Sequence, residues 1–176
     1  FLTGKKWLSL PIDMLAFTVY EGDKGVPRDD ESFGLWKNQG VPEARIAFVG
    51  KDNFWSAGDE GPCGPSTEMF YWTGKTKAPK VYDPLDERWV EIWNDVFMTY
   101  NRMKDGSLVE LEQKNVDTGM GMERTLAVIN GKTNAYETDL FVPIIQRIEK
   151  ISGKKYQDAE REMRIIADHL RAAVFI

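Results

Sequence analysis

Apolar residues in the first 130 positions are grouped in a way that predicts strands. β-branched and aromatic residues run together at Ala16–Tyr20, and a second short run follows at Arg45–Val49. Val90–Tyr100 is strongly apolar and predicts a central strand, although its periodicity also permits a helix. Between the first two runs, Glu31–Asn38 predicts a short helix. This part of the chain is therefore typical of a sheet with few helices.

Turn-forming residues divide these runs. Asp105-Gly106 predicts a hairpin turn, because Gly tolerates the positive φ that such turns require. Asp52–Ser66 holds three glycines and two prolines, and this density predicts irregular structure up to a strand at Thr67–Trp72. Val116–Gly121 predicts a strand that runs directly into a helix at Met122–Ile129.

The pattern changes to helices after residue 131. Apolar residues with helical spacing begin at Leu140, and Gly153 ends this helix. A second helix follows Asp158, and its predicted apolar face carries Met163, Ile166, Leu170 and Val174. The fold class predicted is α+β, with an antiparallel sheet and flanking helices in residues 1–131 and the first helices of a second domain in residues 132–176.

Composition narrows the possible functions. The 176 residues carry a net charge of −5, which excludes a broadly basic nucleic-acid coat. With only Cys63 and His169, the chain holds no Cys/His zinc site of its own, and the single cysteine favours a reducing, cytoplasmic location. No apolar run reaches membrane-spanning length, so no membrane partner is expected. The chain begins without Met and stops inside an apolar run, so we expect a piece of a longer protein.

The most specific segment is the strand–helix junction at Val116–Arg124. Gly119 and Gly121 leave one strand face bare, so that a flat ligand or a phosphate can lie against the backbone. Arg124 follows in the first helical turn, where a guanidinium can stack on a base or bind phosphate. Asp117 can hold an ammonium group. The alternative is a structural glycine turn with a surface Arg–Asp pair.

Two further segments carry polar residues in apolar surroundings. Asn94 lies within the apolar strand, and regular alternation would place it on one face with Ile92 and Val96 and place Glu91 on the other. Asn53-Phe54-Trp55 leads into the Gly/Pro-rich segment that contains Cys63. The alternatives are an asparagine satisfied by a neighbouring loop, and a rigid surface loop in which Cys63 is a small buried side chain.

Taken together and in this order, these segments resemble the alanyl-tRNA synthetase family of class II aminoacyl-tRNA synthetases. The match spans most of the chain, and each motif alone is weak. The residues that carry it are Asn53-Phe54-Trp55, Gly61-Pro62-Cys63-Gly64-Pro65, Thr67-Glu68, Glu91-Ile92-Trp93-Asn94, Asn101-Arg102, Asp117 to Arg124, Thr138-Asp139-Leu140-Phe141 and Ile166-Ala167-Asp168-His169.

The resemblance implies a ligase that activates L-alanine with ATP and Mg²⁺ and transfers it to tRNA(Ala). It implies a helical tRNA-recognition domain from about residue 132. Two class-defining motifs are expected upstream, and zinc is expected only in an editing domain downstream. The fragment alone is therefore expected to be inactive. Oligomeric state stays open.

The resemblance also implies roles for single residues. Asp117 would pair with the alanine ammonium, while Val96, Gly119 and Trp55 would bound the methyl group. Asn94 would lie near the alanine carboxylate or the α-phosphate. ATP would be bound by Glu91, Asn94, Gly119, Gly121 and Arg124, with Glu91 as a possible Mg²⁺ ligand.

No protein nucleophile or general base is expected. Attack of the amino-acid carboxylate on the α-phosphate needs positioning and charge neutralisation, so the lack of a usable catalytic histidine does not count against this activity. A catalytically silent synthetase-like binding module is the alternative, and an arginine-bearing motif upstream would favour the enzyme.

Overall fold

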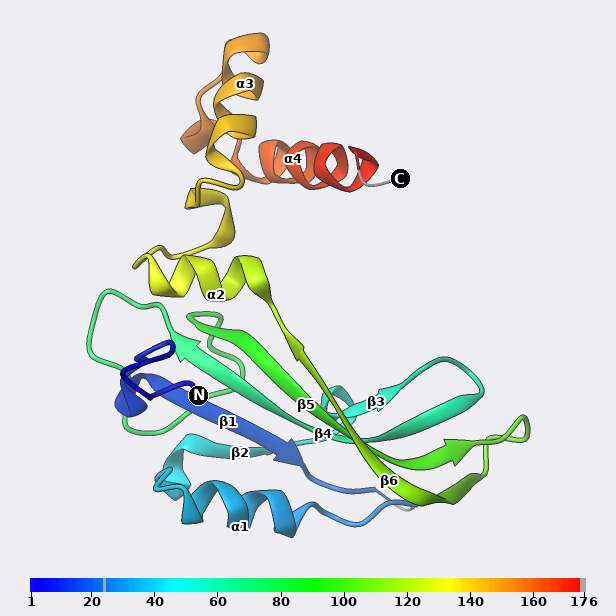
Figure 1. Cartoon of the computed structure of the whole chain (residues 1–176). Helices are drawn as coiled ribbons and strands as arrows, with labels where there is room; N and C mark the ends of the chain where they lie inside the picture. The colour runs from blue at the N-terminus through cyan, green and yellow to red at the C-terminus, as the bar shows by residue number, and fades with distance from the viewer. Residues whose placement is uncertain (24, 175–176) are drawn as a thin grey trace. The chain divides into compact units, whose positions relative to one another are not determined.

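The computed structural model describes residues 1–23 and 25–174. These residues form two compact units, which divide between Gly121 and Met122 (Figure 1). The first unit holds a sheet and one α-helix, and the second holds three α-helices. The α+β class predicted from the sequence is confirmed. The assignment of residues 132–176 to tRNA recognition stays a prediction.

Six strands form one sheet in the described part of the first unit. Its order is β2-β1-β4-β5-β6, and β3 pairs with β4 beside this path. β1 and β2 are parallel, whereas the other pairs are antiparallel. The strands are β1 (Leu15–Tyr20), β2 (Ile46–Val49), β3 (Phe54–Ser56), β4 (Gly61–Trp72), β5 (Trp89–Arg102) and β6 (Leu108–Met120). The middle strand is therefore β4, and the predicted central strand, β5, lies beside it.

The helix α1 (Asp30–Asn38) packs on one face of the sheet, alongside β2 and β1 (Figure 1). Asp29 caps it by accepting a hydrogen bond from the Ser32 amide. Trp36 packs on Phe17 with ring centroids 4.1 Å apart, and its indole N–H donates to Thr67 Oγ1 at 2.8 Å. All six residues of β1 are buried, as expected of an apolar strand covered on both faces.

The Gly/Pro-rich segment is the clearest error of the sequence analysis, because residues 61–66 are strand. Phe54 opposes Pro65 and Trp55 opposes Gly64, so β3 pairs with this part of β4. The β4–β5 register shifts between Cys63 and Ser66, and Pro65 lies in this irregular stretch, whereas Pro62 stays in register opposite Asn101. Cys63 is fully buried, which confirms that it is a small core side chain.

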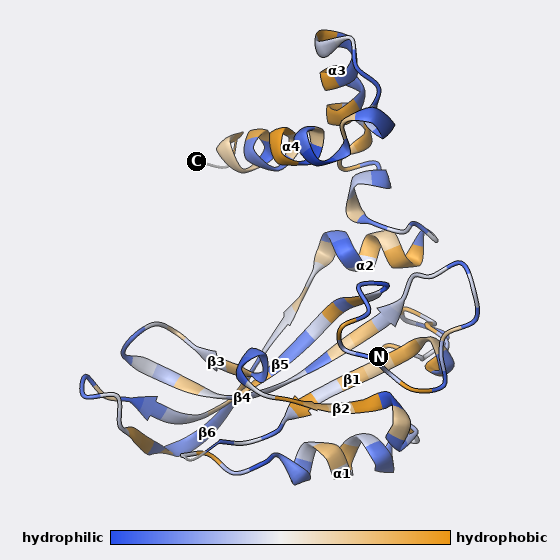
Figure 2. Cartoon of the chain, turned by 180° about the vertical axis from the view of Figure 1, so that it is seen from behind, coloured by the Kyte–Doolittle hydropathy of each residue, from blue (hydrophilic) through white to orange (hydrophobic). Residues whose placement is uncertain are grey.

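β5 and β6 form the hairpin predicted at Asp105-Gly106, where Gly106 has φ +84°. β6 is one continuous strand at the sheet edge, mostly hydrophilic and largely exposed (Figure 2). A second irregularity lies in β5, where Trp93 opposes Met69 but Glu91 opposes Phe70. Ile92 is therefore an extra residue on β5, a β-bulge that interrupts regular alternation.

The second unit consists of α2 (Met122–Ile129), α3 (Val142–Ser152) and α4 (Glu160–Val174), with short 3₁₀ turns at Ala135–Glu137 and Tyr156–Asp158. α2 has the predicted bounds, and Gly153 ends α3 with φ +70°, also as predicted. The core of this unit consists of Phe141, Ile145, Ile148, Met163 and Ala167.

The predicted apolar face of α4 is wrong in part. Met163 and Ala167 are buried one turn apart, whereas Ile166 and Leu170 are 43% and 51% exposed and Val174 is 85% exposed. The helix presents a small residue, Ala167, to its neighbours, and a pattern of large apolar residues does not reveal this contact.

The pairing of β4 with β5 predicts a strict requirement at Gly64. A Cβ on Gly64 would lie 1.8 Å from the carbonyl oxygen of Phe97, which is backbone and cannot move aside. Gly64→Ala should lower the free energy of unfolding by about 3 kcal/mol, the upper end of overpacking effects. Thermal denaturation followed by circular dichroism should show a melting temperature lower by roughly 6–12 °C.

Gly58→Ala is the matched control, because a Cβ there meets only Glu60 O at 3.8 Å. It should leave the melting temperature nearly unchanged. Equal melting temperatures for both variants would contradict the register described here.

Candidate functional site

Four of the predicted site residues share one face of the sheet. Val96 on β5 opposes Asp117 on β6, and Asn94 opposes Gly119. Directly opposed residues of an antiparallel pair point to the same side, and residues two apart on a strand do so as well. The register therefore brings together Asn94, Val96, Asp117 and Gly119. This face is called the binding face below.

A hydrogen bond orients Asn94 on the binding face. The Gly119 amide donates to Asn94 Oδ1 at 3.1 Å, and Thr118 Oγ1 donates to the Asn94 carbonyl at 3.1 Å. Because Oδ1 is the acceptor in the first bond, the Nδ2 group remains as the donor end of the amide. Asn94 is thus suited to donate to an anionic oxygen. The asparagine is satisfied by the neighbouring strand and not by a loop.

Glu91 shares this face, contrary to the prediction from regular alternation. It opposes Phe70, while Asn94 opposes Glu68, and Glu68 and Phe70 lie two residues apart on β4. The bulge at Ile92 reverses the side to which Glu91 points. Glu91 can therefore supply a carboxylate oxygen on this face to a hard cation such as Mg²⁺, which commonly takes only one or two protein ligands beside phosphate oxygens.

Sequence reasoning assigned no role to Glu68 or Thr18, which belong to the same face. Glu68 opposes Asn94, and Thr18 Oγ1 donates to Glu68 Oε2 at 3.2 Å. Tyr82 lies near these carboxylates: burial raises its pKa above the ordinary value, and the charges of Glu68, Asp83 and Glu91 raise it further. Thr67-Glu68 stood in a recognised motif, but only the strand register shows what Glu68 faces.

Trp55 lies apart from the other predicted residues. It is on β3 opposite Gly64, with β4 between it and β5, and 38% of its surface is exposed. Asn53, immediately before this strand, is fully buried. Its Nδ2 donates to Thr18 Oγ1 at 2.9 Å and to the Ser66 carbonyl at 3.0 Å.

Gly121 and Arg124 lie at the strand–helix junction. The Gly121 amide donates to the Ile92 carbonyl at 3.0 Å, which extends the β5–β6 pairing past the end of β6. Arg124 is exposed in the first turn of α2, in the second unit. Next to it, Glu123 pairs with Arg171 at 2.5 Å, and the Glu123 amide together with Arg171 lowers the pKa of that carboxyl group.

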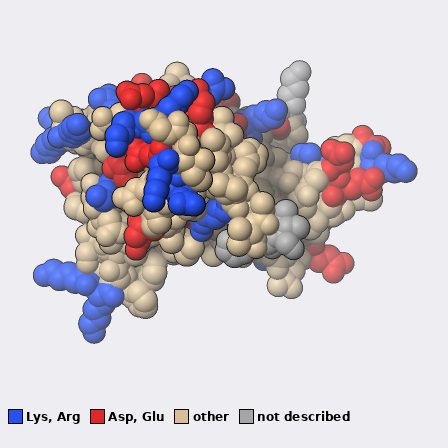
Figure 3. All heavy atoms as spheres, turned by 90° about the horizontal axis from the view of Figure 1, so that it is seen from above, with Lys and Arg blue, Asp and Glu red and all other residues tan. Residues whose placement is uncertain are grey.

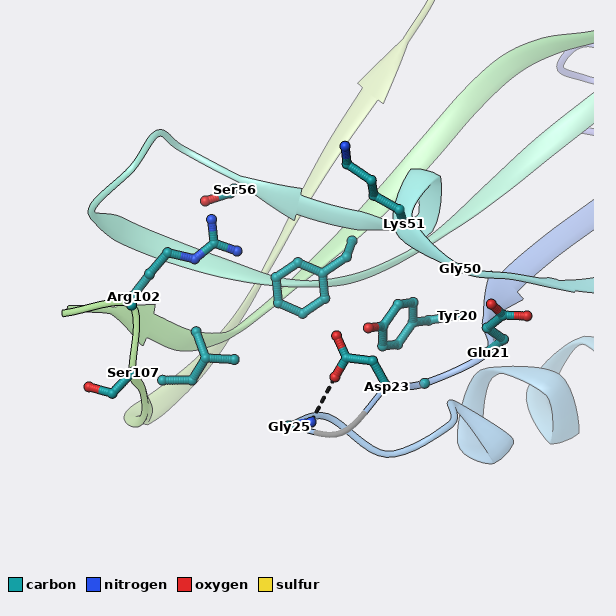
Figure 4. Close-up of a pocket in the computed structure, with 13 residues that line it drawn as sticks. Tyr20, Glu21, Asp23, Gly25, Gly50, Lys51, Ser56, Arg102 and Ser107 are labelled. Atoms are coloured by element: carbon teal, nitrogen blue, oxygen red, sulfur yellow. Dashed lines mark hydrogen bonds between the residues drawn. The ribbon is translucent and has the colours of Figure 1, made fainter. Parts of the chain in front are cut away.

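A cavity of about 1180 Å³ lies elsewhere, at the other end of the sheet (Figure 4). Arg102 and Lys51 line it together with Glu21 and Asp23, so its charges are mixed, and Phe54 forms part of the wall. Asp23 accepts hydrogen bonds from the Gly25 and Val26 amides, and these bonds help to lower the pKa of its carboxyl group. None of the predicted site residues lines this cavity.

The surface gives little further indication of a ligand. Acidic and basic side chains are interspersed on the face seen in Figure 3. Within residues 1–23 and 25–174, no three His, Cys, Asp or Glu residues are grouped so as to hold a metal ion. No helix in that part of the chain is long and apolar enough to cross a membrane.

Comparison with known proteins identifies the family of the chain. A family model described as "tRNA synthetases class II (A)" matches residues 1–176. The chain belongs to this family of class II tRNA synthetases. It is 48% identical over its whole length to the alanine–tRNA ligase of Borreliella afzelii (strain PKo), and 51% identical to that of Treponema denticola. The alanine–tRNA ligase of Anaeromyxobacter dehalogenans is 46% identical over 99% of the chain. The chain spans 31%, 30% and 21% of these three relatives.

The close approach of β6 to Asn94 predicts the effect of a methyl group at Gly119. A Cβ there would lie 3.0 Å from Asn94 Oδ1, closer than such contacts normally come. Gly119→Ala should turn the Asn94 side chain away and break its bond to the Gly119 amide. The loss of stability should be small, about 1 kcal/mol, because only one hydrogen bond is lost at an exposed edge.

The Asn94 side-chain amide signals in NMR should shift strongly in this variant. Gly34→Ala, where nothing lies within 4 Å of the added Cβ, should leave these signals unchanged. An unshifted Asn94 amide in Gly119→Ala would contradict the proposed orientation.

Proposed function

We propose that this chain is part of the catalytic region of an enzyme that activates L-alanine with ATP and transfers it to tRNA(Ala). The family and the names of the relatives support this proposal. The observation that carries it is the β5–β6 register, because it joins a carboxylate, an oriented amide and a bare glycine on one small surface. Alanine offers an ammonium, a carboxylate and one methyl group, and each has a suitable counterpart there.

Asp117 holds the alanine ammonium in this proposal, through a charge-assisted hydrogen bond. Val96 and Gly119 contact the methyl group from the sheet, and Trp55, on β3, covers one side of the methyl pocket. Asn94 donates from Nδ2 to the alanine carboxylate or to the α-phosphate, since its Oδ1 accepts from Gly119. These residues orient the carboxylate for in-line attack, in which its oxygen bonds to phosphorus and pyrophosphate leaves.

ATP and Mg²⁺ fit the same surface. The bare backbone at Gly119 leaves room beside Asn94 that a Cβ would fill, and the bulge puts Glu91 on the binding face. Glu91 would hold Mg²⁺, which neutralises phosphate charge when bound. Gly119 and Gly121 would leave the strand backbone open to the nucleotide. The role that the resemblance implies for Arg124, stacking on adenine or binding a phosphate, stays a prediction.

ATP–pyrophosphate exchange by the full-length protein tests this function. Exchange should depend on L-alanine and should be far weaker with the other standard amino acids. Exchange that is independent of alanine would contradict the proposal. No exchange at all would favour the alternative, a catalytically silent module that only binds.

Asp117→Asn is the sharpest single substitution for this function, because it keeps the shape of the side chain and removes the charge. A charge-assisted hydrogen bond is worth about 1.5–3 kcal/mol, so kcat/KM for alanine should fall about 10- to 140-fold. The KM for ATP should change much less.

The melting temperature should be measured beside the kinetics. If Asp117 only stabilises the start of the following helix, the variant would lose about 1 kcal/mol of stability and keep its alanine kinetics. Unchanged kinetics, or an equal loss of ATP affinity, would show that the assigned role is wrong.

A further inference from the structure

The buried amide of Asn53 connects the two walls assigned to the methyl pocket. Asn53 ends a 3₁₀ turn, Lys51–Asn53, and β3 with Trp55 begins at the next residue. Its Nδ2 donates to the carbonyl of Ser66, and Ser66 is the residue directly opposite Val96. One side chain therefore links the segment that carries Trp55 to the strand that supports Val96.

The direction of these hydrogen bonds is determined by the partners. The Ser66 carbonyl can only accept, so the group facing it must be the Asn53 nitrogen and not its oxygen. The second hydrogen of that nitrogen goes to Thr18 Oγ1, which leaves the Thr18 hydroxyl hydrogen to donate to Glu68 Oε2. Asn53 is therefore linked to the binding face in two ways: through Ser66, which lies opposite Val96, and through the hydrogen bonds of Thr18 and Glu68.

Asn53 would contribute little net stability if its role were only to stabilise the core. It has no exposed surface, and its Oδ1 has no hydrogen-bond partner among the residues that the structure describes. A buried acceptor without a partner costs stability, which offsets much of the gain from the two bonds of Nδ2. The amide instead fixes the relative positions of three segments, because it joins the turn before β3 to Thr18 on β1 and to Ser66 on β4.

We propose that Asn53 is a positioning residue that sets the distance between Trp55 and Val96 and thereby the selectivity of the pocket for a methyl side chain. This inference rests on the proposed function, since it takes the roles of Trp55 and Val96 from there. Without the amide, the turn before β3 loses its hydrogen bond to the Ser66 carbonyl. The segment that carries Trp55 keeps its pairing with β4 but is no longer held by Asn53, and Trp55 shifts relative to Val96. Larger amino acids then enter more easily, and alanine is held less well.

The test uses Asn53→Ala and Asn53→Asp in the full-length protein. Active-site titration comes first, so that all rates are expressed per active site. The kcat/KM for alanine in ATP–pyrophosphate exchange should fall about 10- to 100-fold, the size expected of a displacement near 1 Å. The preference for alanine over serine and 2-aminobutyrate should fall several-fold. The KM for ATP should stay within about 2-fold.

Thr18 supplies a matched pair of variants in case the Asn53 variants fold poorly. Thr18→Val removes the hydroxyl that accepts from Asn53, whereas Thr18→Ser keeps it. Thr18→Val should reproduce the loss of selectivity in part, and Thr18→Ser should restore it.

The outcomes separate this inference from the proposed function. A wild-type protein without alanine-dependent exchange would overturn the function itself. A wild-type protein that exchanges normally, with Asn53 and Thr18→Val variants that lose only active fraction and keep every KM and the selectivity, would overturn the positioning role alone.

Discussion

The pairing of β5 with β4 on one side and β6 on the other is the constraint on which the candidate site depends. A sheet has a side-chain period of two, so a slip of one residue in either register would move half of the site to the opposite face. The irregularities in the β4–β5 ladder are part of this constraint. The bulge at Ile92 brings Glu91 to the side of Asn94, and the bare Gly64 lets β4 approach the backbone of β5.

Glycine has two different roles in this arrangement. At Gly64 the absence of a side chain allows two strands to pack, and a Cβ there would meet backbone. At Gly119 the same absence leaves room beside a functional side chain, and a Cβ there would meet the Asn94 amide. The first position therefore governs stability and the second governs the shape of the binding face. A short glycine motif in the sequence does not distinguish these cases.

Much of the fold could be predicted from the residues, and the reasons differ from element to element. The turn at Asp105-Gly106 and the helix Met122–Ile129 follow from local backbone preferences, so they were predicted correctly. The strand at residues 61–66 was missed because its pairing with β3 and β5, which no local rule describes, outweighs the cost of its prolines. The binding face was predicted in part. Asn94 and Val96 follow from alternation, but Glu91 depends on a bulge and Glu68 on cross-strand register, neither of which is visible in one sequence.

The central claim is that the binding face formed by Asn94, Val96, Asp117 and Gly119 holds the amino acid. A crystal structure of the full-length protein with L-alanine and a non-hydrolysable ATP analogue tests it most directly. The account predicts the alanine ammonium within hydrogen-bond distance of the Asp117 carboxylate, and Asn94 Nδ2 directed at the alanine carboxylate or the α-phosphate. Alanine bound instead in the cavity lined by Arg102, Lys51 and Phe54, with Asp117 facing solvent, would contradict it.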